Sequence, residues 1–410
     1  MRALRSVLLA DLRSAAVVLC LSTAAVAQAV GAALTIDGKS LTGTLVVAED
    51  GFATIKTESG TTKLEVAEIA SFVRSDAKPR KVQVDSRIWL RSGVELPVKK
   101  LKGIAAGDGA PAVLIAQLPS GIEVKLPLSM LRAIRQGGLM RPQPSLFADD
   151  LETPPANNDL IYVVRDGQAR RSAVSVSHLT DKTIEFELRG EAYDFDLKGL
   201  AAVVFGANTG FPPDRQPRPR AVVALTTGER IEGKLLSLGE TLRCRLDEGF
   251  VVEVPMRNLH KFDVSSDKLV WLSELRPEVV QTPAFDRVWP WHVDRSIAGP
   301  GFDLAGRHYE RGIGLVPYTK LTYALDGRFD VFEAKIGIDD RGGPAAHAIF
   351  RVLVDGKPAF ESEPMTRGKK PTDLRVALNK AKSLVIEVDF GKNYDLGDFC
   401  AFADARVIQQ

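Results

Sequence analysis

The sequence predicts an all-β protein in two parts, a series of small β-barrel repeats followed by a C-terminal β-sandwich. Three observations support this fold class. Short apolar strands end at Asp-Gly, Ser-Gly or Thr-Gly turns, one turn-to-strand spacing recurs, and no helical stretch of ten residues interrupts the repeats. The 410-residue chain is long enough for two or three domains.

The first 29 residues have the pattern of a signal peptide. Three arginines give a positive n-region, the run from Ala15 to Val26 is apolar, and Ala27-Gln28-Ala29 offers small residues for cleavage. The apolar run is shorter than the ~20 residues that a membrane anchor needs. We therefore expect a protein that is secreted or held in the periplasm or cell envelope, with no transmembrane segment after signal cleavage.

Charge and cysteine content exclude two further classes of protein, nucleic-acid-binding proteins and scaffolds held together by disulfides. Cleavage removes three arginines and one aspartate, which brings the net charge from +2 to zero. A neutral chain has no global field for polyanions, so we expect no nucleic-acid partner. Cys244 and Cys400 remain, in different predicted domains, and we expect both to be buried, free thiols rather than a disulfide framework.

A short pattern repeats before Ser265. Gly38 precedes Phe72 by 34 residues, and Gly228 precedes Phe262 by the same 34. In each copy an apolar strand meets a hairpin glycine, and a polar or Pro-containing hook precedes the last apolar strand. Two looser copies lie between them. The pattern resembles SH3-like and, most closely, Sm-like barrels, and we expect neighbouring copies to pack together because one such unit buries little surface.

These patterns divide the chain into seven segments. We expect a signal peptide at 1–29, two barrel repeats at 30–140, a Pro-rich linker at 141–157, a third repeat at 158–207, a second Pro-rich linker at 208–220, a fourth repeat at 221–266 and the sandwich at 267–410. Both linkers are expected to be extended and poorly packed.

The last segment contains strands with clean alternation. Val331–Ile338, Ile349–Val354, Asp373–Leu378 and Ser383–Phe390 are each bounded by Gly, Pro, Asn or Asp. Strands at this spacing, without helices between them, indicate a two-sheet antiparallel sandwich.

Five motifs follow one another in this segment: Arg311-Gly-Ile-Gly314, Leu321-Thr-Tyr-Ala-Leu325, Val354-Asp-Gly356, Val388-Asp-Phe-Gly391 and Ala403-Asp-Ala-Arg406. In this order they resemble the NPCBM family of carbohydrate-binding modules, found attached to glycoside hydrolases and on secreted bacterial proteins. The resemblance implies a galactose-binding-like jelly roll that binds glycan. The chain departs from the family at Val316, where members usually have a histidine, so any sugar contact of that histidine is lost here.

Sugar recognition requires aromatic rings against the C–H face of the sugar and polar groups for its hydroxyls. The candidates in this segment are Trp289, Trp291, Asp294, Arg295, Tyr318, Asn393 and Tyr394. The alternative for the two tryptophans is that they close the bottom of the sandwich as core residues.

Two groups of aspartates are candidates for a metal site. The resemblance implies one structural calcium ion, held by carboxylates and backbone carbonyls. Its candidate ligands are Asp339, Asp340, Asp395, Asp398 and Asp404. Asp339 and Asp340 also fit a polar turn at the end of a strand. As adjacent strand residues they point to opposite faces, which does not suit the paired carboxylates of a glycosidase.

No catalytic constellation is visible, because the five histidines are scattered and neither a nucleophile elbow nor a phosphate-binding loop occurs. We therefore predict a non-catalytic, lectin-like protein whose sandwich binds a glycan or cell-surface polysaccharide and whose repeats act as spacers or assembly modules. The alternative is a structural or protein-interaction protein of the cell envelope, with envelope proteins as partners, whose sandwich no longer binds sugar. An enzyme site in the repeats lacks a supporting constellation, and RNA binding conflicts with export and with zero net charge.

Overall fold

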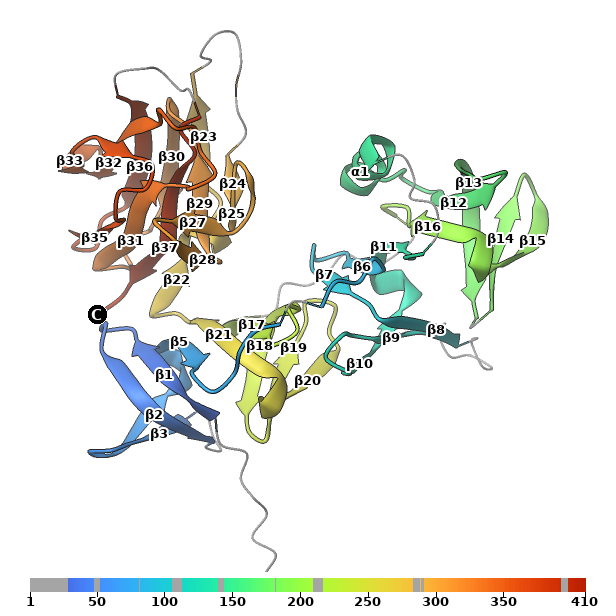
Figure 1. Ribbon diagram of the computed structural model, residues 1–410, viewed down its shortest axis with the longest axis horizontal. Coiled ribbons are helices and arrows are strands. Elements are labelled where there is room, and N and C mark those ends of the chain that lie inside the picture. The colour runs from blue at the N-terminus through green and yellow to red at the C-terminus, as the bar shows by residue number, and fades with distance from the viewer. Residues whose placement is uncertain are drawn as a thin grey trace, which may run out of the picture.

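The computed structural model describes residues 29–47, 52–80, 82–104, 113–138, 144–180, 182–208, 217–282, 288, 291–391 and 397–410. Within these residues the chain forms β-strands, five short 3-10 turns and one α-helix, so the predicted all-β class is confirmed. Figure 1 shows the sandwich standing over the first and fourth units, while the second and third units extend to the other side.

The first and fourth units contain five strands each, in the same spatial order. The strands are β1 (Ala29–Thr35), β2 (Ser40–Val47), β3 (Phe52–Thr57), β4 (Gly60–Glu65) and β5 (Ile69–Arg74) in the first unit, and β17 (Arg220–Leu225), β18 (Arg230–Leu238), β19 (Thr241–Arg245), β20 (Val251–Pro255) and β21 (Leu259–Ser265) in the fourth. A 3-10 turn, η1 (Val66–Glu68) or η4 (Met256–Asn258), precedes each last strand. This turn is the short hook expected from the sequence.

The last strands of these two units pair with each other. β5 and β21 run antiparallel with Phe72 opposite Phe262, and the two rings stack with their centroids 5.6 Å apart. The pairing joins both units into one ten-stranded sheet, in the order β20-β19-β18-β17-β21-β5-β1-β2-β3-β4. The two residues that mark the 34-residue spacing in the sequence therefore meet at the centre of this sheet.

The second and third units pair in the same manner. Their strands are β6 (Arg87–Leu90), β7 (Glu95–Pro97), β8 (Lys100–Ile104), β9 (Val113–Gln117), β10 (Glu123–Pro127) and β11 (Leu131–Arg135), then β12 (Asp159–Arg165), β13 (Gln168–Leu179), β14 (Thr183–Leu188), β15 (Glu191–Asp196) and β16 (Leu200–Val204). β11 pairs with β16, with Ile134 opposite Val203, in an eight-stranded sheet. β8, β9 and β10 form a separate three-stranded sheet.

One expectation about the repeats needs correction, and another holds only in part. The units are not separate closed barrels, because their strands continue into shared open sheets. The expectation that neighbouring copies pack together holds for the pairing of the second and third units, whereas the first unit pairs with the fourth, which is distant in the chain. One edge of the last strand in each unit has backbone groups without a partner inside that unit, and these groups pair with the last strand of another unit.

The segment 141–157 also differs from the extended connector that its prolines suggested. Residues Pro144–Glu152 form the helix α1, which buries Phe147 against Trp89 and Tyr162, with ring centroids 5.6 and 5.7 Å away. The Tyr162 hydroxyl also donates to Asp150 of α1. Proline is tolerated in the first turn of a helix, and the buried aromatic cluster supplies the packing that stabilises this short one.

The C-terminal segment is a sandwich of two antiparallel sheets, as predicted. One sheet contains β24 (His292–Val293), β29 (Gly312–Leu315), β37 (Cys400–Ile408), β31 (Val331–Ile338) and β35 (Thr372–Ala377), with β22 (Leu269–Trp271) paired to β37. The other contains β23 (Glu278–Gln281), β30 (Thr319–Ala324), β36 (Ser383–Phe390), β32 (His347–Val354) and β33 (Lys357–Glu361), with β34 (Met365–Thr366) paired to β32. The short hairpins β25 (Arg295–Ser296) with β26 (Gly299–Pro300) and β27 (Phe302–Leu304) with β28 (Arg307–Tyr309) lie beside them.

Alternate residues of both sheets fill the space between them. The largest fully buried side chains of this core are Tyr323, Phe329, Phe332, Phe350 and Phe402. Cys400 lies in the same core and Cys244 in that of the front half, and both are free and buried as expected. No helix among the described residues is both long and apolar enough to cross a membrane.

Candidate functional site

Two aromatic rings meet at one end of the sandwich, where three neighbouring strands, β30, β36 and β32, begin or end. Tyr318, in the turn before β30, is 37% exposed, and its ring lies edge-on to Phe390 at the end of β36, with centroids 4.7 Å apart. His347 begins the adjacent strand β32, and its carbonyl accepts the N–H of Gly391. We call Tyr318, Phe390 and His347 the aromatic end.

The backbone holds this cluster in place. Tyr318 has a left-handed conformation with φ of 61°, and its N–H donates to Val388 while its carbonyl accepts from Thr282. A side chain at Gly391 would place its Cβ 1.4 Å from His347 Nδ1, so only glycine leaves room for the imidazole. Sequence reasoning found Tyr318 and missed Phe390 and His347, although Phe390 and Gly391 stand in the motif Val388-Asp-Phe-Gly391.

Other predicted sugar contacts lie outside the described residues or in the core. Trp289, Asn393 and Tyr394 are outside the described residues. Trp291 precedes β24 and packs half-buried against the sandwich core, so part of its indole serves the core as the alternative interpretation held. Its neighbour His292 pairs with Gly314 of β29.

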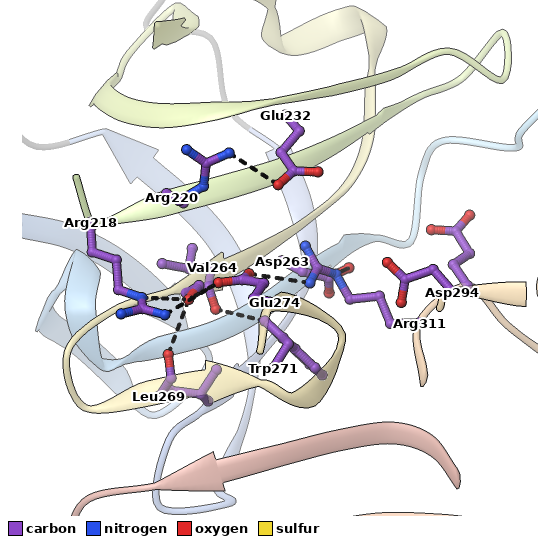
Figure 2. A network of polar contacts seen from close by, with 12 residues as sticks. Arg218, Arg220, Glu232, Asp263, Val264, Leu269, Trp271, Glu274, Asp294 and Arg311 are labelled. Carbon is purple, nitrogen blue, oxygen red and sulfur yellow. Dashed lines mark hydrogen bonds and ion pairs between the residues drawn. The ribbon is translucent and has the colours of Figure 1, made fainter. Parts of the chain in front are cut away.

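Asp294 and Arg295 are placed away from the aromatic end. Asp294 is left-handed, its carboxylate accepts the N–H of Gly312 at 3.0 Å, and Arg230 of the fourth unit lies 3.9 Å away. Burial raises the pKa of Asp294 above its ordinary value, while Arg311 and Arg230 oppose that change. Figure 2 shows Asp294 facing Arg311 within the polar network between the fourth unit and the sandwich. Arg295 is exposed on the short strand β25.

Asp339 and Asp340 anchor a hairpin. Asp339 is fully buried, accepts the N–H of Asp303, and accepts hydrogen bonds from both the backbone and the guanidinium of Arg341. Asp340 accepts the N–H groups of Ala305 and Gly306 in the β27–β28 turn. The contact from Asp339 to the N–H two residues on is an Asx turn, which is the turn chemistry weighed from the sequence.

Of the remaining metal candidates the structure describes Asp398 and Asp404, and neither forms a metal-binding group with these two. Asp398 is buried and accepts the N–H of His347 at 2.8 Å, whereas Asp404 lies further along β37, where burial raises its pKa and Lys261 lowers it. The described residues contain no group of three or more His, Cys, Asp or Glu side chains arranged for a metal ion. Asp395 lies outside the described residues. The described carboxylates therefore do not fit a calcium site among themselves, and calcium stays a prediction.

A polar group missed by the sequence analysis lies beside the hairpin. His308 Nδ1 is 2.7 Å from Asp303 Oδ1, and Arg341 Nε is 3.4 Å from the other oxygen of Asp303. The imidazole is about half exposed, so it offers a hydrogen-bonding surface on β28. No motif marks it, because Arg341 comes from a segment 33 residues beyond His308 in the chain.

The sandwich consists of two antiparallel sheets, and its Gly-x-Gly strand β29 pairs with the last strand, β37. Residues 268–408 match the family model of the NPCBM/NEW2 domain. This segment is an NPCBM domain. The match confirms the family resemblance and covers the sandwich alone, so it says nothing of the four units before it.

One curated relative and several solved structures match part of the chain. The "Putative endo-alpha-N-acetylgalactosaminidase" of Renibacterium salmoninarum is 33% identical over 90 residues, which are 22% of this chain and 6% of that protein. Among solved structures, CBM51 from Clostridium perfringens GH95 in complex with methyl-galactose is 26% identical, with a TM-score of 0.31, over 34% of this chain and 99% of that one. CBM51-2 with INT domains from Clostridium perfringens ZmpB, in complex with GlcNAc, is 22% identical, with a TM-score of 0.31, over 46% of this chain and 40% of that one.

Proposed function

We propose that the NPCBM domain binds glycan without catalysis, and that the aromatic end forms part of the sugar-binding surface. The family match of residues 268–408 carries this proposal. The geometry supports it, because Tyr318 offers an exposed ring before β30 and His347 begins β32, and these two strands flank β36. Ring stacking with nearby hydrogen-bonding groups is the arrangement that sugars require.

The same surface argues for binding rather than for hydrolysis. A glycosidase needs two carboxylates about 5–10 Å apart across an open cleft. At this end the two adjacent aspartates, Asp339 and Asp340, are committed to N–H donors of the β27–β28 hairpin and to Arg341. We further propose that the protein is exported, as its first 29 residues predict, and acts at a cell surface or in the surrounding matrix.

Titration of the full chain with methyl-galactose and with GlcNAc, followed by a glycan array, tests this proposal. Wild-type protein should bind at least one glycan, and Tyr318→Ala should weaken that binding about threefold to tenfold through the lost ring contact. Tyr193→Ala is the matched control, because Tyr193 is a similarly exposed tyrosine in the third unit. Its affinity should equal that of the wild type.

A folded wild-type chain that binds no glycan on the array would overturn the proposal. Equal affinities for the wild type and Tyr318→Ala would instead remove the aromatic end from the site. A silent array would favour the structural or protein-interaction alternative, which Val316 supports because it stands where family members usually have a histidine.

A further inference from the structure

The second and fourth units contact each other through a reciprocal pair of buried carboxylates. Glu229, in the β17–β18 turn, accepts the N–H of Ser120 in the β9–β10 turn at 2.7 Å. Glu248, in the β19–β20 turn, accepts the N–H of Ser92 in the β6–β7 turn at 2.9 Å. The two glutamates are 0% and 6% exposed. An early hairpin of each unit thus contacts a later hairpin of the other, which fixes their relative orientation.

This contact places two edge strands along one groove. β10 of the second unit and β20 of the fourth line a hollow of about 720 Å³, and Asn258 Nδ2 donates to the Ser120 carbonyl across it at 3.1 Å. Among the described residues β10 pairs with β9 alone, and β20 pairs with β19 alone. The outer edges of both strands therefore present backbone N–H and C=O groups that lack a strand partner.

The walls of the groove carry both apolar and charged side chains, the charged ones being Glu123 and Lys125 on β10 and Glu253 and Arg257 on the facing wall. Ile122, Phe250 and Val251 supply apolar surface. On β10, Val124 points into the core, while Glu123 and Lys125, two residues apart, project outward. Side chains that are two residues apart lie on the same face of a strand. An added strand would thus find one acidic and one basic position in fixed order.

We propose that this groove binds an extended peptide segment, which pairs with the edge of β10 as an added β-strand. Backbone edges are satisfied by another backbone, and they favour a peptide over a sugar, which would need aromatic faces. Antiparallel pairing, the more stable arrangement, places an acidic residue opposite Lys125 and, two residues later, a basic residue opposite Glu123. The partner is therefore a strand with the order acid, apolar, base.

Two fluorescein-labelled peptides test this inference on the full chain by fluorescence polarisation. Thr-Val-Glu-Val-Lys-Val-Thr has the proposed order, and Thr-Val-Lys-Val-Glu-Val-Thr has the charges exchanged. The first should bind about threefold to tenfold more tightly, because two cross-strand ion pairs are matched rather than opposed. The double substitution Glu123→Lys with Lys125→Glu should invert this preference.

Two controls separate strand pairing from unspecific attraction. Lys63→Glu changes a lysine on β4, an edge strand of the first unit away from this groove, and should leave both affinities unchanged. N-methylation of alternate backbone nitrogens in the first peptide should abolish its binding. Absence of saturable binding, equal affinity for both peptides, or a preference that survives the double substitution in a folded variant would each overturn the proposal.

Discussion

The Arg311 guanidinium of the sandwich lies 3.6 Å from the carboxylate of Asp263, in the last strand of the fourth unit. The same guanidinium is 3.5 Å from Glu274, lies over the Trp271 ring at 5.0 Å from its centroid, and is 2% exposed. Figure 2 shows these groups meeting between the two parts of the protein. The first glycine-turn motif of the NPCBM domain thus begins with the residue that fastens this domain to the front half.

Replacement of Arg311 by methionine should destabilise the protein by up to about 3–5 kcal/mol, because the buried carboxylates of Asp263 and Glu274 each lose one of two cations and keep only Lys261 and Arg218. Urea unfolding of the full chain measures this change. Arg243→Met is the control, because Arg243 pairs with Glu253 at an exposed site, and it should cost about 1 kcal/mol or less. Equal unfolding midpoints for both variants would contradict the assigned role of Arg311.

Removal of the charge of Asp339 should loosen the β27–β28 hairpin. Burial opposes ionisation of this carboxyl, but its hydrogen bonds with Arg341 and with the N–H of Asp303 hold its pKa below the ordinary 3.8. A lowered folded-state pKa contributes stability that is present above pH 3.8 and is lost as the pH falls through the folded value. Asp339→Asn should therefore cost about 1–3 kcal/mol at pH 7 and progressively less in acid.

Urea unfolding of Asp339→Asn and of the wild type at several pH values measures this difference. Glu363→Gln, which removes an exposed carboxylate from the same domain, serves as the control. A stability difference between Asp339→Asn and the wild type that stays constant from pH 7 to strong acid would show that the charge of Asp339 does not contribute.

Both described cysteines should resist thiol reagents in the native state. Burial raises the pKa of Cys244 to about 12 and that of Cys400 well above its ordinary 9.0. Little thiolate then forms at pH 8, and the reagent cannot reach either sulfur. Iodoacetamide labelling followed by peptide mass spectrometry should find both unlabelled in the native protein and labelled in urea; native labelling of Cys400 would show that the sandwich core opens.

The contact between the second and fourth units should depend on Glu229. Glu229→Ala leaves the buried N–H of Ser120 without its acceptor and should cost about 1–3 kcal/mol. Hydrogen exchange should accelerate at Ser120, with a smaller effect at Ser92, whose acceptor Glu248 is intact. Glu123→Ala, at an exposed position of β10, should leave the stability and the exchange at Ser120 unchanged; a loss as large as that of Glu229→Ala would assign the effect to β10 itself.

Individual strands could be predicted because their cause is local. Alternation from Val331 to Ile338 places Phe332, Ala334, Ile336 and Ile338 in the core, and β31 has these bounds. Apolar residues on one face of a strand are removed from water on folding, and this holds whichever segment packs against them. The candidate site was harder to predict from the sequence, because His347 lies against Gly391, which comes 44 residues later in the chain.

By itself, the sequence determined the strands, the hairpin turns and the apolar surroundings of the two cysteines, because these follow from residues close together in the chain. It also determined the NPCBM character of the last segment, through five short motifs in a fixed order. The tertiary structure decided that the first unit joins the fourth, that residues 144–152 form a helix, and that Asp294 faces Arg311. The edges of two strands pair through backbone groups that every residue has, so the sequence does not specify which strands pair. A short helix or a buried charge is stabilised by neighbours from distant segments. Contacts between distant segments therefore decided how the units pair and where the helix forms, because the local sequence patterns are compatible with more than one arrangement.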